Sequence, residues 1–164
     1  MTEHKVKDGT AGLAPGAKAP DFTLPRDGGG TVSLADFAGK KLVLYFYPRA
    51  NTSGCTREAI EFSRQKAAFS RAGADILGVS ADPVAAQDAF KAKHKLAVAL
   101  AADETHRVLE AYGVWQEKSM YGRKFFGIVR TTFLIGADRR ILRVWPRVSV
   151  DGHAEDVLAA VKAL

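Results

Sequence analysis

The stretch Lys41-Leu42-Val43-Leu44-Tyr45-Phe46-Tyr47-Pro48 is an apolar run that a proline ends. A continuous apolar run of this length is typical of a strand buried on both faces of a sheet. Residues 53–71 follow with apolar side chains at helical spacing, and residues 75–80 form a second apolar run. A strand, a helix and a strand in this order predict a crossover connection between two parallel strands.

The remainder of the chain predicts two hairpins and further helices. Residues 131–135 and 141–145 are strand-like runs around a polar turn, which indicates an antiparallel pair. Residues 22–24 and 31–34 flank three glycines and predict a hairpin near the N-terminus. The other predictions are helices at 83–94 and 105–112, a strand at 97–101, a loop at 114–127 and a final helix beginning near 152. Together they predict an α/β sandwich with a mixed central sheet flanked by helices.

Length and composition indicate one globular domain. The 164 residues are 47% hydrophobic and 26% charged, which is ordinary for such a domain. We expect a flexible tail over residues 1–12 and a single domain over residues 13–164. No apolar run reaches the roughly 18 residues that a membrane span needs, and the charged N-terminus lacks the apolar segment of a signal peptide. We therefore expect no membrane partner.

Charge and cysteine usage exclude several other classes. The net charge is +6, but the basic residues are scattered among acidic ones, so we expect no nucleic-acid partner. A single cysteine cannot form an internal disulfide, which makes the cytoplasm the expected compartment. The four histidines show no metal-ligand spacing, and no motif indicates a metal or an organic cofactor.

The lone cysteine, Cys55, lies where the helix after the first buried strand is predicted to begin. The first turn of a helix presents unpaired N–H groups and a partial positive charge. A thiolate is stabilised at such a position, and a thiolate is the nucleophilic form of cysteine. Cys55 is therefore the candidate nucleophile.

Four neighbours could complete a site that reduces a peroxide. Thr52 lies one helical turn before Cys55, and the N–H groups of Gly54 and Cys55 itself lie at the helix start. Pro48 has no N–H and can shield the thiol from water. Arg130, which enters the strand at 131–135, is the candidate cation, because a guanidinium can hold a sulfur anion and a peroxide oxygen together. Such aimed donors stabilise the charge that develops as the O–O bond stretches.

At this point a family resemblance is clear. The element Pro48…Thr52…Cys55 with Thr56-Arg57-Glu58-Ala59, and the strand that begins Arg130-Thr131-Thr132-Phe133, resemble the active-site motifs of peroxiredoxins. The chain is most similar to the peroxiredoxin Q group, also called bacterioferritin comigratory protein, from about residue 13 onward. The resemblance implies a thioredoxin-like fold. It also implies reduction of hydrogen peroxide and organic hydroperoxides by a peroxidatic cysteine without metal or organic cofactor.

By this match Cys55 is the peroxidatic cysteine, Thr52 and Arg130 are its peroxide-binding partners, and Pro48 is the shielding proline. Gly54, Tyr47 and Glu58 are candidate substrate-binding residues. Purely structural interpretations of several of these residues stay open. Thr52 can cap the helix, and Arg130 can be a surface residue at a strand end. Tyr47 fits a core residue as well as a pocket wall, and Glu58 fits a structural hydrogen-bond network.

One departure from the group's pattern concerns the second cysteine. Many members carry a resolving cysteine five residues after the first, and here that position is Ile60. The sulfenic acid at Cys55 must therefore be reduced by an external thiol, such as thioredoxin, glutaredoxin or a small thiol, or pair with Cys55 of another molecule. We expect a monomer, and a dimer only through that pairing. Two alternatives are a thiol–disulfide oxidoreductase and a binding module in which Cys55 is incidental.

Overall fold

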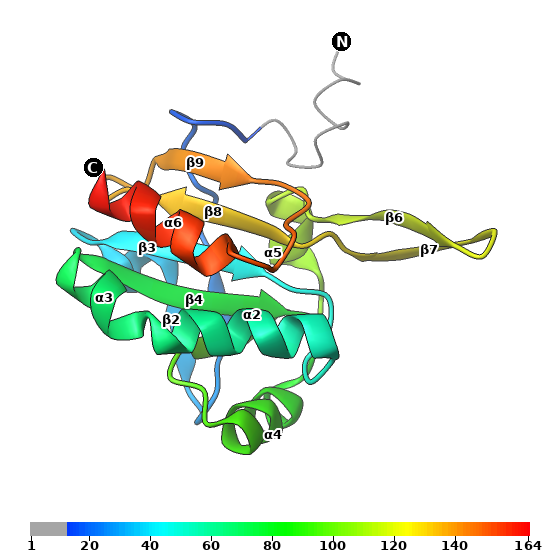
Figure 1. The fold of residues 1–164 in the computed structure, drawn as a ribbon. Helices are drawn as coiled ribbons and strands as arrows, with labels where there is room; N and C mark the ends of the chain where they lie inside the picture. The colour runs from blue at the N-terminus through cyan, green and yellow to red at the C-terminus, as the bar shows by residue number, and fades with distance from the viewer. Residues whose placement is uncertain (1–12) are drawn as a thin grey trace, which may run out of the picture.

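The computed structural model describes residues 13–164; the tail predicted at 1–12 lies outside the described residues. A five-stranded mixed sheet in the order β5-β4-β3-β8-β9 forms its centre (Figure 1). Two-stranded sheets, β1-β2 and β6-β7, lie beside it. The elements are β1 Thr23–Pro25, β2 Thr31–Ser33, the 3-10 helix η1 Leu34–Phe37, β3 Lys41–Phe46, α2 Ser53–Arg64, α3 Lys66–Arg71, β4 Ala74–Ser80, α4 Val84–His94, β5 Ala99–Ala102, α5 Arg107–Ala111, β6 Trp115–Met120, β7 Arg123–Ile128, β8 Thr131–Ile135, β9 Ile141–Trp145 and α6 His153–Lys162.

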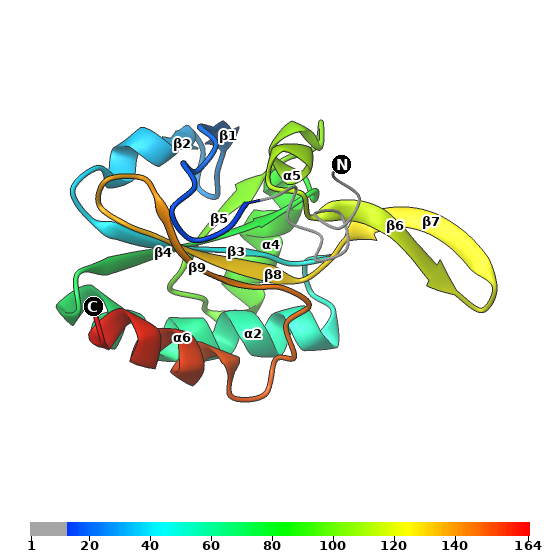
Figure 2. The ribbon, with the colours of Figure 1, turned by 90° about the horizontal axis from the view of Figure 1, so that it is seen from above.

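The central strand β3 separates two apolar cores. Its even-numbered side chains, from Leu42 to Phe46, pack with β1, β2 and α5. Its odd-numbered side chains, together with Tyr47 just after the strand, pack with α2, α3, α4 and α6. Figure 2 shows α2 and α6 on one side of the sheet and α5 with β1-β2 on the other. The predicted burial of this strand on both faces is thus confirmed, because each face is covered by a different layer.

Strand pairing agrees with the predicted sandwich. β3 is parallel to β4, and β4 is parallel to β5. β8 is antiparallel to both β3 and β9, as predicted for the hairpin at 131–145. Within the sheet, Gly78 of β4 lies opposite Tyr45, and a Cβ at position 78 would be 2.6 Å from the tyrosine ring. The absence of a side chain at 78 is therefore what lets the ring lie over β4.

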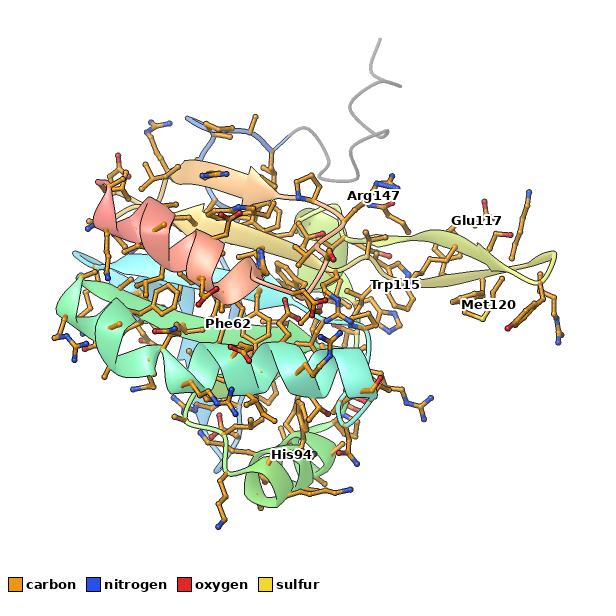
Figure 3. All side chains as sticks on the ribbon, in the orientation of Figure 1. Phe62, His94, Trp115, Glu117, Met120 and Arg147 are labelled. Atoms are coloured by element: carbon orange, nitrogen blue, oxygen red, sulfur yellow. The ribbon has the colours of Figure 1, made fainter. Side chains whose placement is uncertain are left out.

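Two predictions were wrong. The helix predicted over 53–71 is two helices, because the backbone of Gln65 leaves the helical conformation at φ −94° and ψ 1°. After the bend, Phe69 lies in the same buried core as Phe62, which Figure 3 labels. The loop predicted over 114–127 is the hairpin β6-β7, whose turn at Tyr121 and Gly122 has two positive φ angles. Smaller differences are that α4 begins after Pro83, not at it, and that β5 and α5 begin two residues later than predicted.

Within residues 13–164, no helix combines the length and the apolar composition that crossing a membrane requires.

Candidate active site

Cys55 is the third residue of α2 and lies in the core between that helix and the sheet. Only 1% of its surface is exposed. It shares its core with Tyr45, Tyr47 and Phe62. α2 begins just beyond the carboxyl end of β3, which is where α/β sheets place their binding sites. The thiol therefore combines burial in an apolar core with the electrostatics of a helix N-terminus.

Arg130 is far from Cys55 in the sequence but contacts it in the structure. It lies between β7 and β8, and its Nη2 donates a hydrogen bond to Cys55 Sγ at 3.4 Å. Its Nη1 donates to Glu58 Oε1 at 2.7 Å. The planar guanidinium therefore bridges the sulfur and a carboxylate that lie on the same helix. The alternative in which Arg130 is a free surface residue does not fit this geometry.

Glu58 is buried with only one of its oxygens paired. The residue is 1% exposed, and among the described residues no group hydrogen-bonds its Oε2. Burial raises the pKa of Glu58 to about 7, and the charge and hydrogen bond of Arg130 limit the rise. Burial by itself would lower the pKa of Arg130, but Glu58 and Cys55 outweigh that effect and raise it. The guanidinium thus remains cationic beside the sulfur.

Gly54 lets the guanidinium approach the start of α2. A Cβ at this position would lie 3.2 Å from Nη2 of Arg130, tighter than an ordinary contact. The backbone at Gly54 and the guanidinium therefore form two sides of the space next to the sulfur. Gly54 contributes room and a backbone N–H, not a side chain.

Thr52 is the residue that caps α2, but its side chain is turned to another partner. Its hydroxyl donates to the carbonyl oxygen of Arg49 at 2.8 Å and makes no side-chain cap bond. Its carbonyl oxygen accepts the first helical bond, from the N–H of Thr56 at 2.8 Å. Because the hydroxyl proton is committed to Arg49, the free lone pairs of Oγ1 can accept a hydrogen bond from a bound molecule.

The other two predicted residues have different surroundings. Pro48 is half-buried and directly follows β3 and Tyr47. The Tyr47 side chain is buried, and its hydroxyl donates to Gln87 Oε1. Gln87 is anchored in turn on Ser80 Oγ and on the carbonyl of Ala101. The structure thus gives Tyr47 a structural partner, and its contact with substrate stays a prediction.

Sequence reasoning missed Lys118, because it assigned residues 114–127 to a loop. Lys118 is half-buried on β6, and its Nζ donates to the carbonyl of Ile128 at 2.9 Å. Burial lowers the pKa of Lys118, the charge of Arg130 lowers it further, and Cys55 opposes both. Lys118 thus contacts the end of β7, two residues before Arg130. The signal that would have found it is the Tyr-Gly pair at 121–122, flanked by two runs of equal length.

In the part of the chain that the structure describes, no three His, Cys, Asp or Glu side chains gather so as to hold a metal ion. The protein groups that meet here are a thiol, a guanidinium, a carboxylate, a hydroxyl and the start of a helix. These groups can hold a sulfur anion and donate hydrogen bonds to an oxygen next to it.

Comparison with known proteins agrees with this site. The AhpC/TSA family model matches residues 15–144. The chain is 48% identical to a putative peroxiredoxin bcp of Coxiella burnetii over 143 residues, which are 87% of this chain and 95% of that protein. The structure is similar to a PrxQ cysteine mutant of Xylella fastidiosa, with a TM-score of 0.88, 38% identity, and coverage of 92% of this chain and 96% of the other.

A second structural relative is the bacterioferritin comigratory protein of Xanthomonas campestris. Its trapped intermediate/ligand complex structures concern its alkyl peroxide reduction activity. The TM-score is 0.83 at 42% identity, with 87% of this chain and 90% of that chain covered. The expected thioredoxin-like fold is thereby confirmed. The chain belongs to the AhpC/TSA family and, within it, is a one-cysteine peroxiredoxin of the peroxiredoxin Q group.

Proposed function

We propose that Cys55 is the peroxidatic nucleophile of a thiol-dependent peroxidase that reduces hydrogen peroxide and organic hydroperoxides. The thiolate attacks the nearer peroxide oxygen, an S–O bond forms and the O–O bond breaks. Sulfur loses two electrons and becomes a sulfenic acid, while the departing oxygen leaves as an alcohol or water after taking a proton. The observation that carries the proposal is the guanidinium of Arg130, which bridges Cys55 Sγ and Glu58 Oε1.

The bridge matters because of how charge moves in this reaction. Arg130 stabilises the thiolate before the attack, and its N–H groups face the space where the peroxide oxygens would lie. As the O–O bond stretches, negative charge passes from sulfur to the leaving oxygen, and fixed donors stabilise it there without rearrangement. Glu58 holds the guanidinium plane in place and acts as a positioning residue.

Thr52 and Pro48 complete the proposed pocket. Because the Thr52 hydroxyl donates its own proton to Arg49, its oxygen would accept the O–H of the peroxide and orient it. Pro48 lies at the entrance to α2 and offers no N–H to water. Gly54 would present its backbone N–H to the peroxide from the start of the helix.

The second half of the cycle needs another molecule. The chain has one cysteine, so an external thiol must reduce the sulfenic acid, and such thiols are kept reduced in the cytoplasm. The alkyl peroxide reduction activity named for the Xanthomonas campestris relative supports organic hydroperoxides as substrates here. The proposed working form is a monomer that becomes a dimer only if the sulfenic acid at Cys55 of one molecule condenses with the Cys55 thiol of another, with loss of water.

One experiment tests both halves of the cycle. The reduced protein is treated with one equivalent of cumene hydroperoxide and analysed by mass spectrometry. We expect one added oxygen at Cys55 and its removal by dithiothreitol, with no addition in Cys55→Ser. Peroxide loss that proceeds equally fast in Cys55→Ser would refute the proposal. Efficient reduction of a glutathione mixed disulfide with no reaction toward peroxide would instead favour a thiol–disulfide oxidoreductase.

A further inference from the structure

The hairpin β6-β7 projects from the body as an arm. Figures 1 and 2 show it extending beyond the central sheet, at the end of the molecule where α2 begins. Its strands pair only with each other, from Trp115 opposite Ile128 to Met120 opposite Arg123. The turn at Tyr121 and Gly122 has φ angles of 53° and 76°, which are the signature of a tight hairpin turn. The arm is therefore a regular element whose base, Trp115 and Ile128, packs on the core while the rest of the hairpin extends away from it.

The arm carries most of the large hydrophobic side chains that the described residues expose. Six large hydrophobic side chains are exposed within residues 13–164, and four of them are on this hairpin. Tyr121 is 97% exposed, Phe126 61% and Met120 56%, and Phe125 is the fourth. Clustered exposed apolar side chains mark interaction sites more often than single ones do. Glu117 and Met120 project to opposite sides (Figure 3).

The arm is also cationic. It has three basic residues, Lys118, Arg123 and Lys124, against one acidic residue, Glu117. Arg123 and Lys124 are exposed, and neither forms an ion pair with any of the described residues. An apolar surface with unpaired cations fits a partner whose own apolar patch has carboxylates around it.

The base of the arm is part of the Cys55 site. β7 ends at Ile128, two residues before Arg130, which contacts the sulfur. Lys118, halfway along β6, donates from Nζ to the carbonyl of Ile128 at 2.9 Å, which ties the arm to the segment that leads into Arg130. Trp115 fixes the base by stacking on His106 with ring centroids 3.9 Å apart. A molecule seated along the arm would therefore lie at the end of the protein where α2, the helix of Cys55, begins.

We propose that the β6-β7 arm is the docking surface for an acidic protein dithiol that reduces oxidised Cys55. The inference rests on the proposed function: a chain with one cysteine must bring a foreign thiol to that cysteine on every turnover. The arm supplies apolar contact area and positive charge at the end of the molecule that carries Cys55.

The reaction balances with a dithiol partner. One partner thiolate attacks the sulfenic sulfur, an S–S bond forms, the S–O bond breaks, and hydroxide leaves and takes a proton to become water. The second partner thiolate then attacks the partner's own sulfur in this mixed disulfide. Cys55 leaves as a thiolate, and the partner is left as an internal disulfide. Because Cys55 is 1% exposed, the first turn of α2 must open for the first step, and the arm holds the partner nearby meanwhile.

The test compares two reductants in steady-state peroxide turnover. One is an acidic bacterial thioredoxin or glutaredoxin, kept reduced by its own reducing system and NADPH; the other is dithiothreitol, which is small and uncharged. The double variant Arg123→Glu/Lys124→Glu should raise the KM for the protein reductant by about tenfold, because reversing charges at an interface rim slows association. Its turnover with dithiothreitol and its oxidation by peroxide should not change.

Two further variants make the comparison specific. Tyr121→Asn keeps a residue that tolerates a positive φ but removes the exposed ring, and it should also raise the KM for the protein reductant only. Lys66→Glu/Lys162→Glu makes the same change in net charge on α3 and α6, at the opposite end of the molecule (Figure 1). This control should leave both reductants unaffected. Added salt should weaken turnover with the protein reductant alone.

Several results would overturn the proposal. One is that dithiothreitol supports turnover but neither thioredoxin nor glutaredoxin does. Another is that the arm variants lose as much turnover with dithiothreitol as with the protein reductant. A reduced protein that sediments as a dimer and becomes a monomer in Arg123→Glu/Lys124→Glu would assign the arm to a second copy. Flotation of the protein, but not of that variant, with phosphatidylglycerol vesicles would assign the arm to an anionic membrane. Failure with dithiothreitol as well would refute the proposed peroxidase instead.

Discussion

Gly54 and Arg130 approach so closely that a Cβ at position 54 would lie 3.2 Å from the guanidinium Nη2. The same nitrogen donates to Cys55 Sγ. The missing side chain at 54 therefore determines how far the arginine can reach over the start of α2. Backbone and guanidinium thus lie in close contact next to the sulfur.

Gly54→Ala should separate activity from stability. Alanine favours a helix over glycine by about 1 kcal/mol, so the melting temperature should stay equal or rise. The added methyl displaces the guanidinium by a few tenths of an ångström, and misplaced catalytic groups lose rate steeply. We expect oxidation by peroxide to slow roughly tenfold in stopped-flow measurements. An unchanged rate would mean that Arg130 adjusts freely and that the close approach has no catalytic consequence.

Arg130→Lys should show whether the reaction needs the planar guanidinium with its two donors or only a positive charge. A lysine ammonium is a point charge and cannot donate to Glu58 and Cys55 in the same planar arrangement. We expect the second-order rate constant with hydrogen peroxide to fall about 10²-fold, while the urea midpoint changes little because the carboxylate keeps a cationic partner.

The matched control for this prediction is Arg143→Lys. Arg143 lies on β9, where its guanidinium is 4.5 Å from the centre of the Trp145 ring. Its replacement by lysine should leave the rate unchanged. Equal rates in Arg130→Lys and the parent protein would exclude the bridging geometry as the source of the activity.

Glu58 makes stability depend on pH in a direction opposite to most carboxylates. Its pKa is raised from 4.5 to about 7 in the folded protein, so between these values the folded state binds more protons than the unfolded one. The contribution of Glu58 to the free energy of unfolding is fully present below pH 4.5 and is lost as the pH rises through about 7. The shift corresponds to about 3 kcal/mol.

Glu58→Gln removes this titration and isolates the effect. We expect the free energy of unfolding of the parent protein, measured in urea, to fall between pH 5 and pH 8 relative to that of the variant. The difference between the two proteins cancels the other titrating groups, His153 among them. A parent-minus-variant difference that stays constant with pH would show that Glu58 is already ionised at pH 5.

The sandwich could be predicted from sequence because its strands are apolar on both faces. β3 sends Leu42, Leu44 and Phe46 into one core and Val43 and Tyr45 into the other, and such a run is visible without any long-range information. The hairpin β6-β7 has almost no buried face, so its sequence lacks the alternation that identifies a strand. The bend at Gln65 was equally hidden, because apolar spacing continues through it.

The site was only partly predictable for a similar reason. Cys55 and Thr52 belong to one local turn, and Arg130 was the candidate cation both from its place before a strand and from the peroxiredoxin resemblance. The bridge from Arg130 to Glu58 joins residues 72 positions apart, and the contact of Lys118 with the end of β7 needs the hairpin to be in place. Local sequence also left open which way the Thr52 hydroxyl turns. It donates to Arg49, and this makes the last prediction specific.

Thr52→Val removes the hydroxyl while keeping the shape and the β-branched backbone preference of the side chain. In the structure that hydroxyl makes no cap bond to α2, so the stability lost should be that of one hydrogen bond to Arg49, about 1 kcal/mol. Oxidation by peroxide should slow about 10²-fold, because the acceptor that orients the peroxide O–H is gone. Thr52→Ser restores an oxygen at the same place and should recover the rate to within a few-fold. If Thr52→Val loses stability but keeps its rate, the hydroxyl serves the turn before α2 and not the substrate.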